Sequence, residues 1–227
     1  MNRKDLALVL KTTRYDDNKN IAECWTRENG TRSFYVRTGA QNSRRKILFK
    51  PAQWLEIQYI EKPRRLPVAT SVSRLYLYRN LPGDLRKTAV IYFITDILRQ
   101  TQKYQNPDPA FFDYTFKQIR LFDQTPFKPD FHLHFLIQLA KQSGISPFTS
   151  QNGTIFDNIS AEKDKLSSFN GMEELDIKLM ENFIRNGKTR SRDERKSLLN
   201  GWLHFFKYHF ENFKTPEVIR IYNEIFE

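Results

Sequence analysis

The stretch YVRTGAQNSRRKILFKPAQWLEIQY, residues 35–59, places a basic turn between two segments in which apolar and polar residues alternate. Alternation with a period of two is typical of a half-buried β-strand. Gly39 and the pair Asn42-Ser43 are turn-forming residues, so one strand should end near Thr38 and the next should begin near Ala52. The stretch therefore predicts a positively charged β-hairpin.

The turn of this hairpin is rich in bases and contains no acid. Within 14 residues the sequence has five basic side chains: Arg37, Arg44, Arg45, Lys46 and Lys50. Because no neighbouring acid neutralises them, they are typical of a phosphate-binding loop. The alternative is a solvated loop that only keeps the protein in solution, which is the usual role of a basic run.

The positive charge of the chain is concentrated in its first third. Residues 1–80 contain 17 Lys and Arg against 7 Asp and Glu, whereas residues 81–227 contain 20 against 19. A concentrated positive field steers a polyanion, so we expect a basic binding module attached to a nearly neutral scaffold. Membrane phospholipid is the competing anion. Since the first third has neither a basic amphipathic helix nor a long apolar run, we expect nucleic acid and no membrane partner.

Short strands separated by turn-forming residues fill the first 80 positions. The pattern predicts five of them, at residues 6–13, 21–26, 31–38, 52–61 and 68–78. Five strands in about 75 residues favour a small closed antiparallel barrel, because closure removes unpaired edges. Arg14, Arg64 and Arg65 lie at or next to the turns of this barrel, so we count them with the five loop bases as candidate DNA-binding residues.

The pattern becomes helical after Leu81-Pro82-Gly83-Asp84, where Asp84 is placed to cap a helix at residues 85–104. Further helices are expected after Pro109 and at residues 131–143, 172–186, 192–212 and 216–226. Residues 146–170 are polar and irregular, with one hairpin signal at Asn152-Gly153. We therefore expect an α+β protein with two domains: a barrel at residues 1–80, and an all-α domain at residues 81–227 with an irregular insertion at about 146–170.

The residue types that perform catalysis are sparse and scattered. His132 and His134 are two positions apart on an expected helix, so they point about 200° apart and cannot share a ligand face. The phosphate-binding and nucleophile motifs GxxxxGK[ST], GxGxxG and GxSxG do not occur in the sequence. We expect no catalytic residues and no enzyme; an active site without a recognisable motif is the alternative.

Cys24 is the only cysteine, so no intramolecular disulfide is possible, and the chain has neither a secretory signal pattern nor a run of about 20 apolar residues. We therefore expect a soluble, cytoplasmic protein. Four aromatic residues, Tyr15, Tyr35, Trp54 and Tyr59, lie within the expected basic barrel. An exposed ring there can stack on a base for about 1–3 kcal/mol, although packing inside the barrel is the alternative for each.

The order of these features resembles the RecO family of bacterial recombination mediators. LVLKTTRYDDNKNIAECWTRENGTRSFYVRTGA (residues 8–40) is similar to the family's first strands and basic Gly loop, and SRRKILFKPAQWLEIQY (residues 43–59) to the segment after it. FLIQLAKQSGISP (residues 135–147) is similar to its central helix, and RKSLLNGWLHFFKYHFENFKTPEVIRIYNEIF (residues 195–226) to its final helices. The resemblance covers most of the chain and contains no strict catalytic motif.

The resemblance implies an N-terminal OB-fold, a helical C-terminal domain, a nucleoid-associated location, and binding of single- and double-stranded DNA with strand annealing. It also implies two partners, RecR and the C-terminal tail of single-stranded-DNA-binding protein. For the acidic, apolar-ended tail we expect a rim of four bases in the helical half: Arg185, Lys188, Arg190 and Arg192. An adaptor that binds an acidic protein tail, or an RNA-binding OB protein, is the alternative function.

The sequence departs from many members of that family in one respect. Those members have four cysteines that form a zinc site after the central helix, and residues 146–170 here contain none. We therefore expect no metal and no cofactor, which metal analysis of the purified protein tests.

Overall fold

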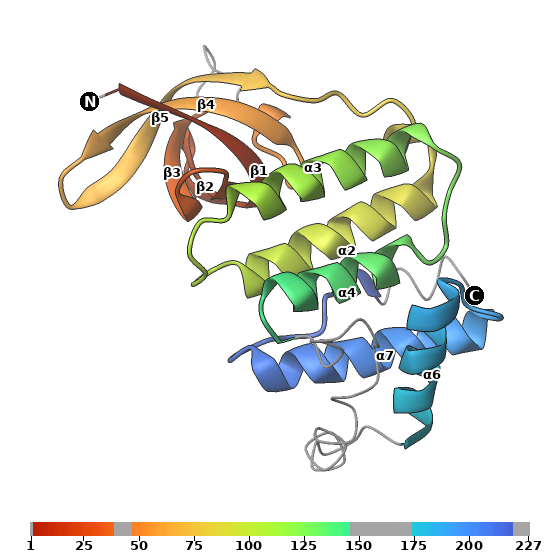
Figure 1. Ribbon diagram of the computed structural model, residues 1–227. Helices are drawn as coiled ribbons and strands as arrows, with labels where there is room; N and C mark the ends of the chain where they lie inside the picture. Colours follow the sequence, from red (N-terminus) through yellow and green to blue (C-terminus); the bar gives the residue numbers. More distant parts are fainter. Residues whose placement is uncertain (1, 39–46, 146–173, 220–227) are drawn as a thin grey trace. The chain divides into compact units, whose positions relative to one another are not determined.

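The computed structural model describes residues 2–38, 47–145 and 174–219 (Figure 1). The first part of the chain forms five strands: β1 (Asn2–Asp16), β2 (Lys19–Thr26), β3 (Gly30–Arg37), β4 (Trp54–Lys62) and β5 (Arg65–Arg74). All five predicted strands are present, and β1 extends several residues beyond the predicted range at both ends. The last strand ends at Arg74, four residues before the predicted end.

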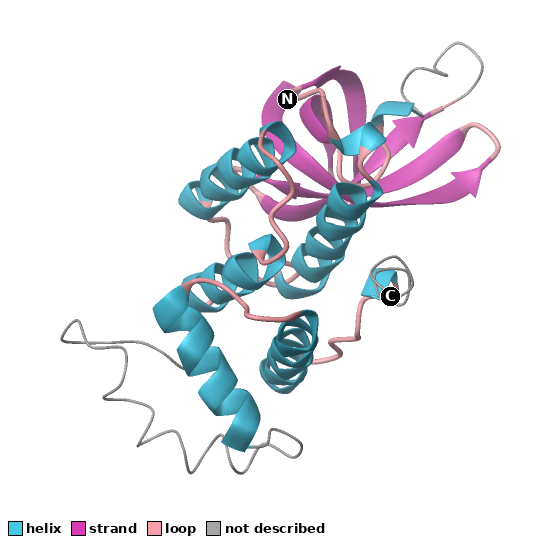
Figure 2. Cartoon of the chain, turned by 90° about the vertical axis from the view of Figure 1, so that its right-hand side faces the viewer, coloured by secondary structure: helices cyan, strands magenta, loops and turns pink. Residues whose placement is uncertain are grey.

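The five strands, magenta in Figure 2, form a closed barrel. Their order around it is β1-β2-β3-β5-β4. Four of the neighbouring pairs are antiparallel, and a parallel pair at Tyr35 and Val68 joins β3 to β5 and closes the barrel. This is an OB-fold, a small barrel of five strands. The predicted antiparallel barrel is confirmed, with one parallel pair that the alternation pattern does not reveal.

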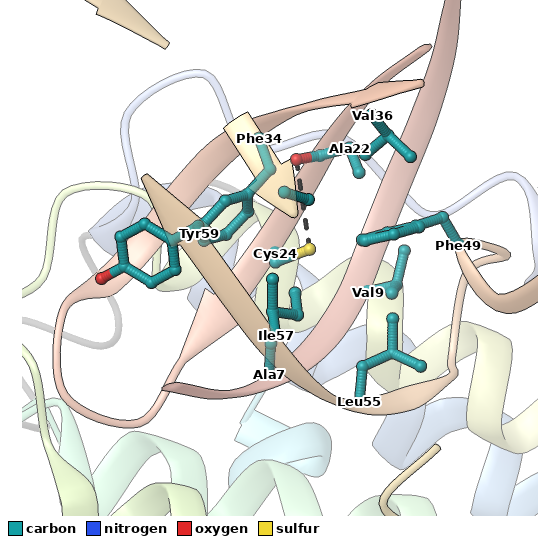
Figure 3. Packing of buried hydrophobic residues seen from close by; sticks show 11 residues of the cluster. Ala7, Val9, Ala22, Cys24, Phe34, Val36, Phe49, Leu55, Ile57 and Tyr59 are labelled. Atoms are coloured by element: carbon teal, nitrogen blue, oxygen red, sulfur yellow. Dashed lines mark hydrogen bonds between the residues drawn. The ribbon is translucent and has the colours of Figure 1, made fainter. Parts of the chain in front are cut away.

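The interior of the barrel is filled by alternate residues of the strands, as the pleat requires. Figure 3 shows this cluster, whose members are Ala7, Val9, Ala22, Cys24, Phe34, Val36, Phe49, Leu55, Ile57, Tyr59 and Ala69. Phe34 and Tyr59 make an edge-to-face contact with ring centroids 5.1 Å apart. Burial also raises the pKa of the Cys24 thiol far above its ordinary value, so this thiol stays protonated and acts as a small apolar side chain.

Two helices pack against one end of the barrel: α2 (Leu85–Thr101) and α3 (Pro109–Gln124). The ring of Trp54 on β4 lies 5.3 Å from that of Phe112 and 4.9 Å from that of Phe116, both on α3. Trp25 on β2 also contacts Phe112, with ring centroids 5.0 Å apart. These aromatic contacts close this end of the barrel with α3.

The cap predicted for α2 is present, and α3 also begins with a side-chain cap. The side chain of Asp84 accepts hydrogen bonds from the backbone N–H groups of Arg86 and Lys87, and that of Asp108 accepts one from Phe111. Each satisfies a donor that the first turn of a helix leaves unpaired. A 3₁₀ helix, η2 (Leu81–Gly83), precedes Asp84 and completes the change from strand to helix.

The remaining described helices are α4 (Phe131–Gln142), α6 (Glu174–Asn186) and α7 (Arg192–His209). The side chain of Ser191 accepts a hydrogen bond from Glu194 N–H, as in a capping box, but the Glu194 carboxylate accepts from Arg190 N–H. Asp130 at the start of α4 accepts from Thr189 and Arg195. These bonds hold the connection between α6 and α7 against α4.

The contacts divide the chain into two compact units, residues 1–127 with 216–227, and residues 128–215. The first unit therefore contains the barrel together with α2 and α3, and the predicted domain boundary at residue 80 stays a prediction. The predicted insertion at 146–170 and most of the predicted last helix lie outside the described residues. In the described part of the chain, no helix combines the length and the apolar character needed to span a bilayer.

Candidate nucleic-acid interface

The outward-facing residues of β1, β2 and β3 form a surface that we call the outer β face. The strand register places Lys19 opposite Arg37, Ile21 opposite Tyr35, and Glu23 opposite both Ser33 and Lys11. On β1, three alternate residues continue this surface: Lys11, Thr13 and Tyr15, all of them exposed. In an OB-fold this side of the barrel and the loops beside it are where oligonucleotides bind.

Two tyrosines form the apolar part of the outer β face. The side chain of Tyr15 is 65% exposed, and its ring meets that of Tyr35 edge-on with centroids 6.4 Å apart. The contact fixes Tyr15 against the sheet while leaving most of its surface open. An exposed, fixed ring is suited to stacking on an unpaired base.

The turn between β1 and β2 is rich in ion pairs. Lys19 Nζ lies 2.7 Å from a carboxylate oxygen of Asp16, and Arg14 forms an ion pair with Asp17. The hydrogen bond from Lys19 lowers the pKa of Asp16, and bonds to Asp16 and then Tyr35 raise the pKa of Lys19. Both groups are therefore charged at neutral pH. Arg37 is exposed at the end of β3 and forms no ion pair within the described residues.

The eight predicted DNA-binding residues are not on one surface. Arg37 lies at the outer β face and Arg14 beside it at the turn between β1 and β2, whereas Arg64 and Arg65 are at the turn between β4 and β5. Arg64 has φ +55°, in a region that residues other than glycine rarely adopt, which fixes it at the tip of that turn. Lys50 is exposed before β4, while Arg44, Arg45 and Lys46 lie outside the described residues.

The four predicted aromatic residues separate into two groups. Tyr15 and Tyr35 are on the outer β face, but Trp54 and Tyr59 are 0% exposed and belong to the packed interior. The hydroxyl of Tyr59 accepts a hydrogen bond from Arg32, whose guanidinium also pairs with Glu61. Neither buried ring is available for a base.

Sequence reasoning missed Lys11 and Lys19 as members of the outer β face. A signal was present, since Lys11, Thr13 and Tyr15 are spaced two residues apart in a predicted strand and the turn after it, and Lys19 begins the next strand. The register that brings Lys19 beside Arg37 was not predictable, because it depends on how β2 and β3 pair.

In the second compact unit, the bases expected to form the partner rim are all exposed. Arg185 ends α6, Lys188 and Arg190 are in the connection, and Arg192 begins α7. Arg195, which was not among the predicted residues, is instead engaged by Asp130, with 2.8 Å between Nε and the carboxylate oxygen. Hydrogen bonds to that carboxylate from Arg195 and Thr189 outweigh the effect of burial and lower the pKa of Asp130.

The described residues include no cluster of three or more His, Cys, Asp or Glu side chains placed to hold a metal ion. His132 is buried in α4, and burial lowers its pKa to about 3, so the imidazole is neutral. The absence of a zinc site stays a prediction.

Taken together, an OB-fold with aromatic and basic residues on its outer β face and helices after it defines a class of protein: OB-fold proteins with a helical C-terminal region. Comparison with known families agrees with this class. A family model described as "Recombination protein O N terminal" matches residues 1–76, and one described as "Recombination protein O C terminal" matches residues 82–162.

Curated relatives that are called DNA repair protein RecO align over the full chain. The relative from Flavobacterium psychrophilum is 24% identical over 237 residues, and that from Phocaeicola vulgatus is 25% identical over 245 residues. The relative from Flavobacterium johnsoniae is 23% identical over 241 residues. In all three comparisons the alignment covers 100% of this chain and 100% of the relative. This chain belongs to the RecO family.

Proposed function

We propose that the protein acts in recombinational DNA repair by binding single- and double-stranded DNA, promoting strand annealing and helping to load a recombinase, without a catalytic step. The observation that supports this most directly is the outer β face, where the exposed ring of Tyr15 lies against Tyr35 and close to the bases Lys19 and Arg37. Its place of action would be the nucleoid in the bacterial cytoplasm.

The mechanism is electrostatic. Two complementary strands repel each other through their phosphates, and a basic surface that neutralises those phosphates lets base pairing proceed. Stacking on Tyr15 holds a base unpaired until its complement arrives. No group on the protein needs to gain or lose a proton in this process.

RecR and the tail of single-stranded-DNA-binding protein are the proposed protein partners. A tail that ends in acids and an apolar residue needs bases at the edge of an apolar surface. The four rim bases are exposed, and α7 beside them contains the buried aromatic residues Trp202, Phe205 and Phe206. A synthetic tail peptide should bind the full chain less well after Lys188→Ala and Arg190→Ala together. Unchanged binding would remove these two bases from the rim.

A fluorescence anisotropy titration of the full chain with single-stranded DNA, duplex DNA and RNA, repeated across salt concentrations, tests the proposal. About five phosphate contacts predict a log-log salt slope of roughly −3.5 on single strands. Binding of RNA alone would favour the RNA-binding alternative. Absence of binding to any nucleic acid would favour the adaptor.

The contribution of the basic loop is tested by replacing Arg44, Arg45 and Lys46 together with Ala. We expect weaker binding and a salt slope flatter by about 2 units, at roughly 0.7 per lost contact on single strands. A matched control removes three exposed bases elsewhere, Lys103, Lys196 and Lys207, with the same loss of charge. If both variants change the slope equally, the loop acts only through net charge.

A further inference from the structure

A second group of bases lies away from the outer β face, where the connection from β5 to α2 runs along α3 (Figure 1). We call it the linker patch, and it consists of Arg74, Arg79, Lys117 and Arg120. All four side chains are exposed, and none forms an ion pair with another described residue. Of the bases in the same compact unit, several others have an acidic partner within 4.0 Å, among them Arg3, Lys4, Arg27 and Arg32.

Contacts between the connection and α3 bring these bases together. The ring of Tyr76 meets that of Phe116 edge-on, with centroids 6.2 Å apart. The guanidinium carbon of Arg120 is 5.5 Å from the centre of the Tyr76 ring and 5.6 Å from that of Phe116. A guanidinium held over aromatic faces is oriented before a ligand arrives and keeps its N–H donors for a phosphate. Lys117 is one helical turn before Arg120 on the same helix, so the two are neighbours.

The acid nearest to this patch in the chain is already used. Asp123 is 0% exposed and accepts hydrogen bonds from the Tyr76 hydroxyl and from the backbone N–H groups of Arg79, Asn80 and Leu81. Lys87 Nζ donates to the backbone carbonyls of Asp123 and Thr125. These bonds fix the connection against the end of α3, which makes the patch a rigid surface, and they bury the carboxylate beneath it.

The linker patch is distant from the outer β face. Trp54, which packs on Phe116 beside the patch, pairs with Leu8 on β1. Tyr15 is seven residues further along the same strand, which at about 3.3 Å per residue places it roughly 20 Å away. A short strand on the outer β face therefore leaves the linker patch open to a second strand.

We propose that the linker patch is a second binding site for the sugar-phosphate backbone of a nucleic acid strand, so that one molecule holds two strands at once. The proposal rests on the proposed function, because a second strand matters only if the chain handles nucleic acid. The absence of a local acidic partner favours a polyanion over a zwitterionic ligand. The patch offers no free aromatic face, since Tyr76 is covered by Arg120, and so it holds the backbone without distinguishing bases.

The test uses the full chain with Arg74, Arg79, Lys117 and Arg120 each changed to Gln, which keeps part of each aliphatic stem. The control changes Lys103, Lys128, Lys196 and Lys207 to Gln, for the same loss of charge at exposed positions elsewhere. Circular dichroism of both variants should match that of the unchanged protein, because all eight positions are exposed. The unfolding midpoint should fall only slightly in the linker-patch variant, which loses the contact of Arg120 with Tyr76 and Phe116.

Two readouts separate the sites. Titration of a short labelled single strand should give two equivalents bound to the unchanged protein and to the control, but one equivalent to the linker-patch variant. The rate of annealing of two complementary strands should fall on the order of tenfold in that variant. The salt dependence that the second bound strand adds, at roughly 0.7 units of log-log slope for each base that contacts a phosphate, should disappear with it.

Each other outcome overturns the inference. One equivalent bound by the unchanged protein, or equal annealing by both variants, would leave the proposed function standing but exclude a second site here. If the unchanged protein binds no DNA, both the proposed function and the second site are excluded. Loss of binding to a synthetic acidic peptide, with DNA stoichiometry unchanged, would assign the patch to a protein partner instead.

Discussion

The two ends of the barrel use aromatic residues in opposite ways. At the end covered by α3, Trp25 and Trp54 are enclosed by Phe111, Phe112 and Phe116. At the other end, where β1 turns into β2, Tyr15 is 65% exposed and its only described ring contact is with Tyr35. The first end stabilises the fold, and the second leaves rings and charges open to a ligand.

The difference shows that composition alone does not identify a binding residue. All four candidate aromatic residues are in the same basic barrel, yet the two that pack against α3 or inside the barrel cannot reach a ligand. What separates them is the side of the sheet for Tyr59, which faces the barrel interior, and the covering by α3 for Trp54. Stability and binding should therefore respond to substitutions at different ends.

The largest effect is expected from Trp54→Ala. This change removes a fully buried ring that contacts Phe112 and Phe116, so it should lower the free energy of unfolding by about 3–5 kcal/mol. Denaturant unfolding measures it, with Trp54→Phe as a control that keeps an aromatic ring and should lose much less. A loss below about 1 kcal/mol in the alanine variant would mean that α3 does not stabilise this end of the barrel.

A smaller loss of stability is expected from Asp123→Asn, at about 2–3 kcal/mol, because the new amide group places donors against backbone N–H groups. Burial alone would raise the pKa of Asp123, but hydrogen bonds from Arg79 N–H and the Tyr76 hydroxyl outweigh it and lower the pKa below 3.8. The carboxylate therefore stabilises the fold above pH about 4, and this contribution is lost as the pH falls through the lowered pKa.

Unfolding measured between pH 7 and pH 2 checks that assignment. The free energy of unfolding of the unchanged protein should fall as the pH drops below the ordinary pKa of an Asp carboxyl group. That of Asp123→Asn should fall less over the same range. Tyr76→Phe is the matched control, since it removes one donor to the carboxylate but leaves the backbone bonds in place. An identical acid response of the unchanged protein and the asparagine variant would exclude Asp123 as the group responsible.

Much of the fold was predictable from the sequence. Alternation located the five strands, and Asp84 marked a helix start where a side-chain cap is present. The parallel closure of β3 on β5 was not predictable, because a single pair at Tyr35 and Val68 leaves no periodic signal. The helix boundaries differ by a few residues because caps fix helix starts more strongly than ends.

The candidate site was less predictable than the fold. Local charge identified Arg14 and Arg37 but also included Arg64 and Arg65, which are at another turn. The linker patch was missed because its members are separated by more than 40 positions, from Arg74 to Arg120, and meet only when the connection packs on α3. Contacts between distant segments leave no trace in local composition.

At the open end of the barrel, Tyr15→Ala should weaken binding of single-stranded DNA by about 1 kcal/mol or more, which is the loss of one base stack. The free energy of unfolding should change little, since most of the ring is exposed. Anisotropy titrations with an ordinary strand and with one that has abasic sites measure the effect. Tyr15→Phe is the control and should bind as the unchanged protein does. Equal binding of both strands by the unchanged protein would exclude stacking at Tyr15.

The smallest effect concerns the acids of the turn between β1 and β2. Asp16 pairs with Lys19, and Asp17 with Arg14, so each base of this turn has an internal counterion that a phosphate must replace. Changing both acids to Asn should therefore strengthen binding to single-stranded DNA and steepen the salt slope by at most about 0.7 per released base. The unfolding midpoint should not move, because ion pairs this exposed contribute little to stability.

The control is Glu28→Gln together with Asp113→Asn, which removes the two partners of Arg27 at the α3 end of the barrel. That control makes the same change in net charge. An equal gain in affinity from both double variants would show that the turn acts through net charge alone, whereas a gain confined to the turn would place Arg14 and Lys19 in contact with phosphate.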